Sequence, residues 1–104
     1  MCWLNVLESR GKHVLGPYRV LDCTDERGWF AGYLLAQLGA DVVLVEPEGG
    51  WPRGDAHVAY NRGKRSIALD LKSEAGREIA WRLIAGSDVV IQNLRPGAVE
   101  KLGL

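Results

Sequence analysis

The stretch Asp41-Val42-Val43-Leu44-Val45-Glu46 decides the fold of this chain. It is an almost continuous apolar run, which is typical of a parallel strand covered on both faces. Gly39 stands just before it, where a helix would end in the left-handed conformation, and Pro47 ends it. Residues 29–38 carry apolar side chains at helical spacing. The sequence therefore predicts a helix that leads into a buried strand.

The strand–helix–strand pattern occurs twice. Residues 18–23 form a β-prone run before the helix at 29–38, and residues 66–71 alternate as a strand does. Ser73 is a good N-cap for the next helix, and residues 88–92 form another apolar strand. Two βαβ units cross over right-handed and build a parallel sheet with helices on its faces. We therefore expect an α/β fold with an open parallel sheet.

The chain of 104 residues is long enough for one small domain. Residues 1–17 show no clean period and are interpreted as a lead-in segment, so the domain comprises residues 18–104. Residues 48–63 contain several glycines and a proline but few periodic apolar positions. They are predicted to form an ordered, irregular loop, and a loop of this length suggests a functional role.

Composition favours an ordinary soluble protein, with 47% hydrophobic and 25% charged residues. The formal net charge of +0 argues against broad electrostatic binding to nucleic acid or to an anionic membrane. No apolar stretch approaches the length that spans a bilayer, and the first residues lack a signal-peptide core. Cys2 and Cys23 lack metal-site spacing. We expect a cytoplasmic protein without a metal, nucleic acid or membrane partner.

An open α/β sheet binds ligands beyond the carboxyl ends of its strands. The loop Asp25-Glu26-Arg27-Gly28 follows the first strand, and the helix after it offers free amides to an anion. The loop lacks the G-x-G-x-x-G fingerprint, its carboxylates would repel a phosphate, and a solvated turn is the alternative. Glu46 stands where a Rossmann enzyme places its ribose-binding acid, or equally it hydrogen-bonds the following loop.

Two further loops carry candidate polar groups. The run Arg62-Gly63-Lys64-Arg65 could collect a phosphate, or it is a solvated loop. The turn Asn93-Leu94-Arg95-Pro96-Gly97 could hold a polar ligand, or Asn93 bonds its own backbone. His13 and His57 have no partner at ligand spacing, and the sequence contains neither a nucleophile elbow nor a P-loop. No residue is therefore predicted to be catalytic.

Taken together, five ordered motifs resemble the family III CoA-transferases, the group that contains formyl-CoA transferase, carnitine CoA-transferase and alpha-methylacyl-CoA racemase. The resemblance covers residue 16 to the last residue. The motifs are residues 19–22, 34–43 running into 45–47, 61–72, 88–97 and 102–104.

The resemblance implies a Rossmann-like large domain, incomplete here, in enzymes that form interlocked homodimers. It implies transfer of CoA between carboxylic acids through an acyl-aspartate intermediate, with acyl-CoA and carboxylic acids as substrates and no permanently bound cofactor. In the racemase branch the same scaffold instead exchanges a proton beside the thioester carbonyl. The family's catalytic aspartate is expected beyond residue 104, so this chain is expected to be an amino-terminal fragment that is inactive alone.

The resemblance also assigns residues to CoA. Leu69 and Lys72 match a segment beside the adenosine end, with the lysine near phosphate. Residues 93–95 match the loop that lies along CoA, and Lys101 matches a position often held by a phosphate-binding arginine. The eight residues assigned to CoA are Arg27, Gly28, Leu69, Lys72, Asn93, Leu94, Arg95 and Lys101.

The first loop departs from the family pattern. Arg27 and Gly28 match the loop that approaches the thioester end of CoA. Here Asp25-Glu26-Arg27-Gly28-Trp29 replaces the family's small, Gly-Pro-containing turn and is one residue shorter. The substrate class therefore does not follow from the resemblance.

Two other functions stay open. A stand-alone module could bind CoA or a partner chain without catalysis, and a coding region downstream with the missing aspartate would favour the enzyme over it. The nucleotide-binding domain of an oxidoreductase is disfavoured by the missing glycine fingerprint, and nicotinamide binding would restore it.

Overall fold

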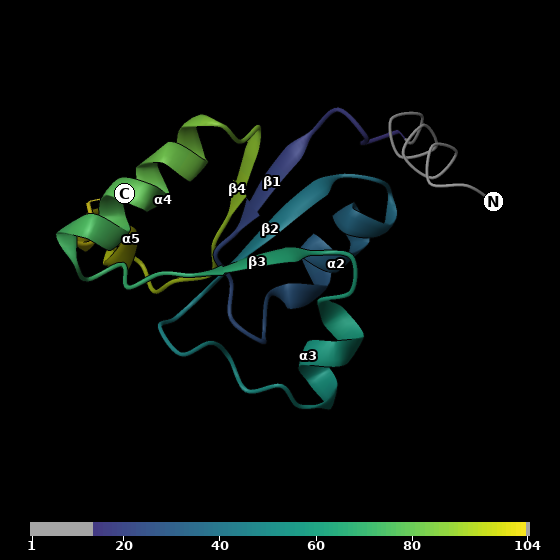
Figure 1. The fold of residues 1–104 in the computed structure, drawn as a ribbon, viewed down its shortest axis with the longest axis horizontal. Coiled ribbons are helices and arrows are strands. Elements are labelled where there is room, and N and C mark those ends of the chain that lie inside the picture. The colour runs from purple at the N-terminus through teal and green to yellow at the C-terminus, as the bar shows by residue number, and fades with distance from the viewer. Residues whose placement is uncertain (1–13, 104) are drawn as a thin grey trace.

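The computed structural model describes residues 14–103, so Cys2, His13 and most of the expected lead-in segment lie outside the described residues. A parallel sheet is built from β1 (Arg19–Asp22), β2 (Asp41–Glu46), β3 (Arg65–Ala68) and β4 (Val89–Ile91), in the order β3-β2-β1-β4 (Figure 1). The helices are α2 (Trp29–Gln37), α3 (Asp55–Tyr60), α4 (Glu74–Ala85) and α5 (Ala98–Lys101). The predicted α/β fold is confirmed.

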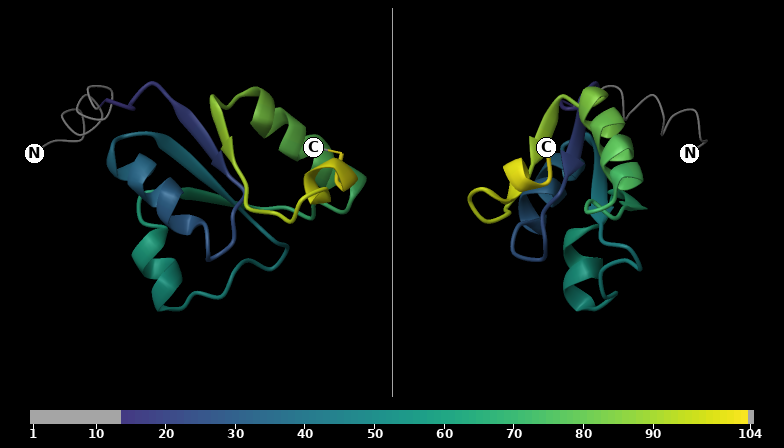
Figure 2. Two further views of the ribbon diagram at one scale, coloured as in Figure 1. Left: turned by 180° about the vertical axis from the view of Figure 1, so that it is seen from behind. Right: turned by 90° about the vertical axis from the view of Figure 1, so that its left-hand side faces the viewer.

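The sheet separates two apolar clusters, because successive residues of a strand point to opposite faces. Val20 and Val42 pack on one face against α2. Leu21, Val43 and Val45 pack on the other face against α4. Figure 2 shows the two helices on opposite sides of the sheet. The continuous apolar run of β2 thus supplies side chains to the apolar clusters on both faces of the sheet, as predicted.

The helix ends follow local signals in the sequence. The Ser73 hydroxyl accepts a hydrogen bond from the Gly76 N–H at 2.9 Å, which confirms Ser73 as the N-cap of α4. Gly39 has a φ of 101°, so the left-handed stop after α2 is also confirmed.

Two elements differ from expectation. The segment 48–63, predicted to be irregular, contains α3, and none of the helix residues is fully buried. An unburied helix needs no apolar face, so periodicity could not reveal it. The apolar run of β4 resembles that of β2, yet Val89 and Val90 are 46% and 43% exposed. The reason is that β4 pairs only with β1 and lies at an edge of the sheet.

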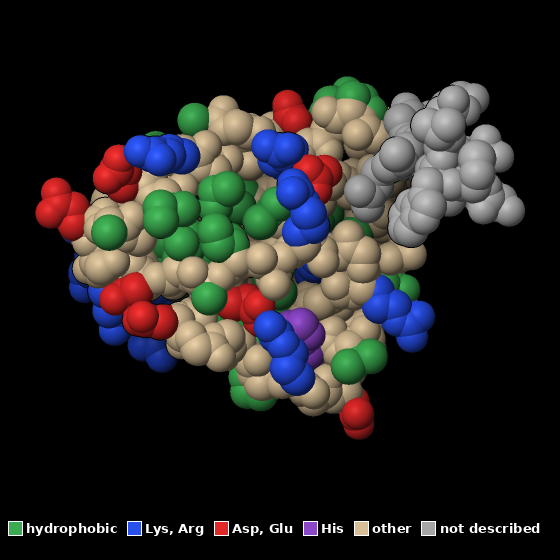
Figure 3. Space-filling model, in the orientation of Figure 1, with side chains coloured by type: hydrophobic (Ala, Val, Ile, Leu, Met, Phe, Trp, Pro, Cys, Tyr) green, Lys and Arg blue, Asp and Glu red, His purple; other side chains and the backbone are tan. Residues whose placement is uncertain are grey.

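The face of the sheet beside α4 is only partly covered. Hydrophobic side chains gather there in Figure 3. Val43, Ile67 and Leu83 line a cavity of about 390 Å³, with Arg19 and Arg65 at the same cavity.

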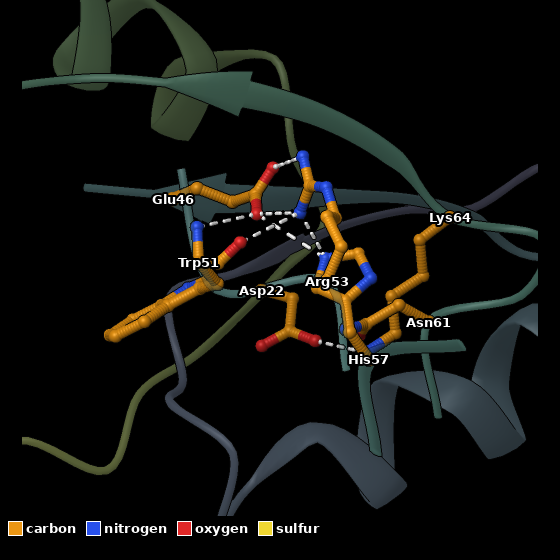
Figure 4. A network of polar contacts seen from close by, with 7 residues as sticks. All are labelled: Asp22, Glu46, Trp51, Arg53, His57, Asn61 and Lys64. Carbon is orange, nitrogen blue, oxygen red and sulfur yellow. Dashed lines mark hydrogen bonds and ion pairs between the residues drawn. The ribbon is translucent and has the colours of Figure 1, made fainter. Parts of the chain in front are cut away.

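A buried ion pair joins β1 to the loop before β3. Asp22 is 0% exposed and the Lys64 side chain 1%. The Lys64 Nζ donates to Asp22 Oδ2 at 2.8 Å and to Asn61 Oδ1 at 2.8 Å (Figure 4). It also donates to the Trp29 carbonyl at 2.9 Å. Burial lowers the pKa of Lys64, while the bond to Asp22 acts against this shift. The ammonium uses all three of its protons and fixes three segments together.

We expect Lys64→Met to lower the free energy of unfolding by about 3–5 kcal/mol, because the Asp22 carboxylate would stay buried without its partner. Arg62→Met is the control, since Arg62 is exposed and forms no ion pair within residues 14–103. Urea denaturation followed by tryptophan fluorescence measures both. If Lys64→Met does not fold, the double variant Asp22→Asn/Lys64→Met should restore folding. Equal stabilities of the Lys64 and Arg62 variants would contradict the assigned role.

Candidate functional site

The carboxyl ends of the strands meet at one edge of the sheet. From β1 the chain continues to β2 and β3 on one side and later to β4 on the other. The loops after β1 and β4 therefore face each other where the strand order reverses, which is where open α/β sheets bind ligands.

Asp25 and Asn93 connect these two loops. The Asn93 Nδ2 donates to Asp25 Oδ1 at 2.7 Å, and the Asp25 N–H donates to Asn93 Oδ1 at 3.2 Å. Asn93 therefore bonds across the reversal point and not to its own backbone. Hydrogen bonds from Arg27 and then from Asn93 hold the pKa of Asp25 at about 2, so this carboxyl is ionised at neutral pH.

Gly28 fits closely under this connection. A β-carbon at Gly28 would lie 2.6 Å from Thr24 Cβ and 3.0 Å from Asn93 Nδ2. Thr24 cannot move aside freely, because it is buried and its hydroxyl donates to Asp22 Oδ1 at 2.6 Å. Gly28 is thus a steric requirement of the junction.

An apolar cavity of about 450 Å³ opens at the carboxyl edge, and we call it the edge cavity. The loops after β2 and β3 and the segments around Leu94 and Leu102 form it. Its apolar lining includes Cys23, Val45, Leu69 and Leu71, and Lys72 contributes a cation. Burial raises the pKa of Cys23 to about 11, so its thiol stays neutral and is a wall residue rather than a nucleophile.

A second cavity, of about 620 Å³, lies between the loop after β1 and the segment leading into α3; we call it the aromatic cavity. The ring of Trp29 meets the ring of Trp51 edge-on, with centroids 6.2 Å apart, and the ring of His57 edge-on at 5.2 Å. All three residues line the cavity, together with Arg27. Trp51 also lines the edge cavity, so the two cavities share it as a wall.

Glu46 fixes the wall between the cavities (Figure 4). Its buried carboxylate accepts from the Trp51 N–H at 3.1 Å, from Arg53 Nη2 at 3.0 Å and bonds His57 Nε2 at 3.3 Å. The hydrogen bonds from Arg53, opposed by burial and helped by the Trp51 N–H, lower the pKa of Glu46 to about 2. Of the two interpretations of Glu46, the structure shows the bond to the following loop.

Sequence reasoning missed His57. It is bonded to Glu46 and packed against Trp29, residues distant in the chain, so no local spacing marks it. The long Gly-rich segment around it was the only signal that pointed there.

Of the two interpretations of residues 62–65, the phosphate-binding cluster is not formed, and the solvated loop holds for the exposed Arg62 and Arg65 but not for Lys64. Lys64 is buried against Asp22, and Arg65 pairs with Asp41 at 2.7 Å. Consecutive side chains at the start of a strand point in different directions. The start of β3 also lies at the amino edge of the sheet, opposite the edge cavity and the aromatic cavity.

The eight residues assigned to CoA fall into groups. Leu69, Lys72 and Leu94 come together in the edge cavity. Arg27 lines the aromatic cavity, and Gly28 and Asn93 form the junction beside it. Arg95 and Lys101 are exposed and line neither cavity, although each is next in sequence to a leucine that lines the edge cavity.

Within residues 14–103, no group of three or more His, Cys, Asp or Glu side chains is arranged to hold a metal ion. No helix in the same part of the chain is long and apolar enough to cross a membrane.

The fold and the cavities at its carboxyl edge define a Rossmann-like α/β protein. The model of CoA-transferase family III matches residues 15–104, and the chain belongs to this family.

Several relatives are named as CoA-transferases. Formyl-CoA:oxalate CoA-transferase from Streptomyces coelicolor is 47% identical over 97 residues, which cover 82% of this chain and 24% of that protein. Succinyl-CoA:(R)-benzylsuccinate CoA-transferase subunit BbsE from Thauera aromatica is 39% identical over 102 residues, which cover 84% of this chain and 25% of that protein. The chain thus spans about a quarter of the length of these relatives.

A solved structure shares the fold. The crystal structure of a CAIB/BAIF family protein from Brucella suis matches with a TM-score of 0.78 and 37% identity. The match covers 84% of this chain and 27% of that one.

The low pKa of Glu46 predicts a pH dependence. A carboxyl whose pKa falls from 4.5 to about 2 on folding stabilises the folded state fully above its unfolded pKa. This stabilisation is lost as the pH falls from about 5 towards 2. We expect Glu46→Gln to destabilise the protein at pH 7 and the difference from wild type to shrink across that range, measured by urea denaturation. Glu48→Gln, at an exposed glutamate nearby, should show no such trend.

Gly28→Ala should lower the free energy of unfolding by about 1–3 kcal/mol, because the added carbon overlaps Thr24 and displaces Asn93. Gly54→Ala is the matched control, since a β-carbon at Gly54 meets nothing within 4 Å. Thermal denaturation compares the two variants. Similar stabilities would show that the junction accommodates a side chain.

Proposed function

We propose that this chain is the amino-terminal CoA-binding portion of a family III CoA-transferase that moves CoA between carboxylic acids. The supporting observation is the edge cavity, which gathers Leu69, Lys72 and Leu94 from two separate loops. In this proposal residues 18–104 are part of the large domain of a cytoplasmic homodimer, and no residue of this chain is the nucleophile.

The lining of the edge cavity suits the nucleotide end of CoA. Apolar side chains such as Leu69 and Leu71 offer a surface for a flat base. Lys72 supplies a point charge for a phosphate, and the exposed Arg95 and Lys101 add cations beside the cavity. Glu46, Glu48 and Asp70 also line the cavity, so the proposed fit to an adenine attached to phosphates rests on the apolar floor and on the cations that stand beside these acids.

Binding the nucleotide end serves the chemistry at the other end of the molecule. In the proposed reaction an aspartate carboxylate attacks the thioester carbonyl, the CoA thiolate leaves, and a mixed anhydride forms. The CoA thiolate then attacks the aspartyl carbonyl of the anhydride, which releases the donor acid and leaves CoA on the aspartate. The acceptor carboxylate displaces the thiolate to form a second anhydride, and the thiolate attacks the acceptor's acyl carbon, which yields the new thioester and the free aspartate. Binding energy gained at the remote nucleotide positions the thioester for this attack.

Isothermal titration of the chain with CoA and with dephospho-CoA tests the proposal. We expect saturable binding of CoA, with Lys72→Ala weakening it about fivefold, the effect of losing one exposed charge contact of about 1 kcal/mol. Lys72→Ala should also reduce the preference for CoA over dephospho-CoA. Arg62→Ala, an exposed cation at the opposite edge, is the control. Absence of saturable binding, or equal effects of the two variants, would contradict the proposed site.

A further inference from the structure

The aromatic cavity contains buried hydrogen-bond donors without acceptors. The indole Nε1 atoms of Trp29 and Trp51 are both buried, and neither has a hydrogen-bond partner. Trp29 is only 2% exposed. A buried tryptophan N–H usually finds a partner, and leaving a donor unpaired costs about 1–3 kcal/mol. Both residues line the same cavity, although the two nitrogen atoms themselves are not exposed on its surface.

The walls of this cavity are aromatic and held in place. Trp51 and His57 each contact the ring of Trp29 edge-on, and Pro52 and Ala56 add apolar surface. Glu46 holds the Trp51 backbone and the His57 ring by hydrogen bonds. Such a preformed aromatic wall favours a flat apolar group over a flexible polar one.

The charges around the cavity are mainly negative. Asp25, Glu26 and Asp55 line it, and Arg27 is the cation among the lining residues. Arg27 is engaged by Asp25 at 2.7 Å. Neither Glu26 nor Asp55 forms an ion pair within the described part of the chain. A ligand carboxylate placed here would meet like charges, which costs binding free energy.

The position of the cavity relates it to the edge cavity. Trp51 lines both, so the two cavities are neighbours. We infer that the aromatic cavity receives the acyl group of the thioester and selects an uncharged aromatic acyl group against a dicarboxylic one. This inference rests on the proposed function for the route by which the acyl group arrives.

The first test compares phenylacetyl-CoA, succinyl-CoA and CoA by titration. Phenylacetyl-CoA is expected to bind about tenfold more tightly than succinyl-CoA. The double variant Glu26→Gln/Asp55→Asn should tighten succinyl-CoA several-fold and leave phenylacetyl-CoA unchanged. Both residues are exposed, so the variant preserves the core, and Glu78→Gln on α4 is the control. Equal affinities for the two thioesters would overturn the inference.

The second test observes the tryptophan walls of the cavity directly. The indole N–H resonances of Trp29 and Trp51, identified with Trp29→Phe and Trp51→Phe, should shift when phenylacetyl-CoA is added. The resonance of Trp81, on α4 and away from both cavities, should stay. Unchanged resonances of Trp29 and Trp51 would overturn the inference.

A third arm separates this inference from the proposed function. If CoA itself does not bind, phenylacetamide and succinate replace the thioesters in the resonance experiment. A shift with phenylacetamide and none with succinate would support the aromatic site while the CoA proposal fails. No shift with phenylacetamide, or an equal shift with succinate, would overturn both.

Discussion

The Lys64 ammonium lies inside the protein and gives each of its protons to a different segment: β1 at Asp22, the start of α2 at the Trp29 carbonyl, and the loop before β3 at Asn61. The Trp29 backbone is thereby fixed relative to the sheet, and the Trp29 ring forms part of the aromatic cavity. Asp22 in turn accepts from Thr24, which packs under Gly28. The loop after β1 therefore takes its shape from a charge pair on its buried side.

Glu46 shapes the loop after β2 in the same way as the pair of Asp22 and Lys64 shapes the loop after β1. It stands at the last position of its strand, and its carboxylate holds Trp51, Arg53 and His57. Two strands thus end in buried carboxylates that organise the loops beyond them, and both cavities lie in those loops. An acid at the end of a strand here has a structural use that needs no ligand.

The fold could be predicted because its signals are local. The apolar run of β2, the stop at Gly39 and the N-cap at Ser73 each depend on neighbouring residues, and the structure confirms each. The site could be predicted only in part. Leu69, Lys72 and Leu94 came from a family pattern, whereas the pairing of Asp25 with Asn93 and of Glu46 with His57 joins distant residues. The burial of Lys64 could not be predicted, because charge spacing says nothing about which side chain is buried.

The exposure of β4 has a consequence for how this chain meets other polypeptides. Its outer backbone groups have no strand beside them within residues 14–103, and Val89 and Val90 present apolar side chains along the same strand. Such an edge is a template for β-augmentation, in which an added strand extends the sheet through main-chain hydrogen bonds. The opposite edge, β3, begins with Arg65, and a charged residue at an edge discourages pairing. The β4 edge, with its two exposed valines, is therefore the more apolar template for an added strand.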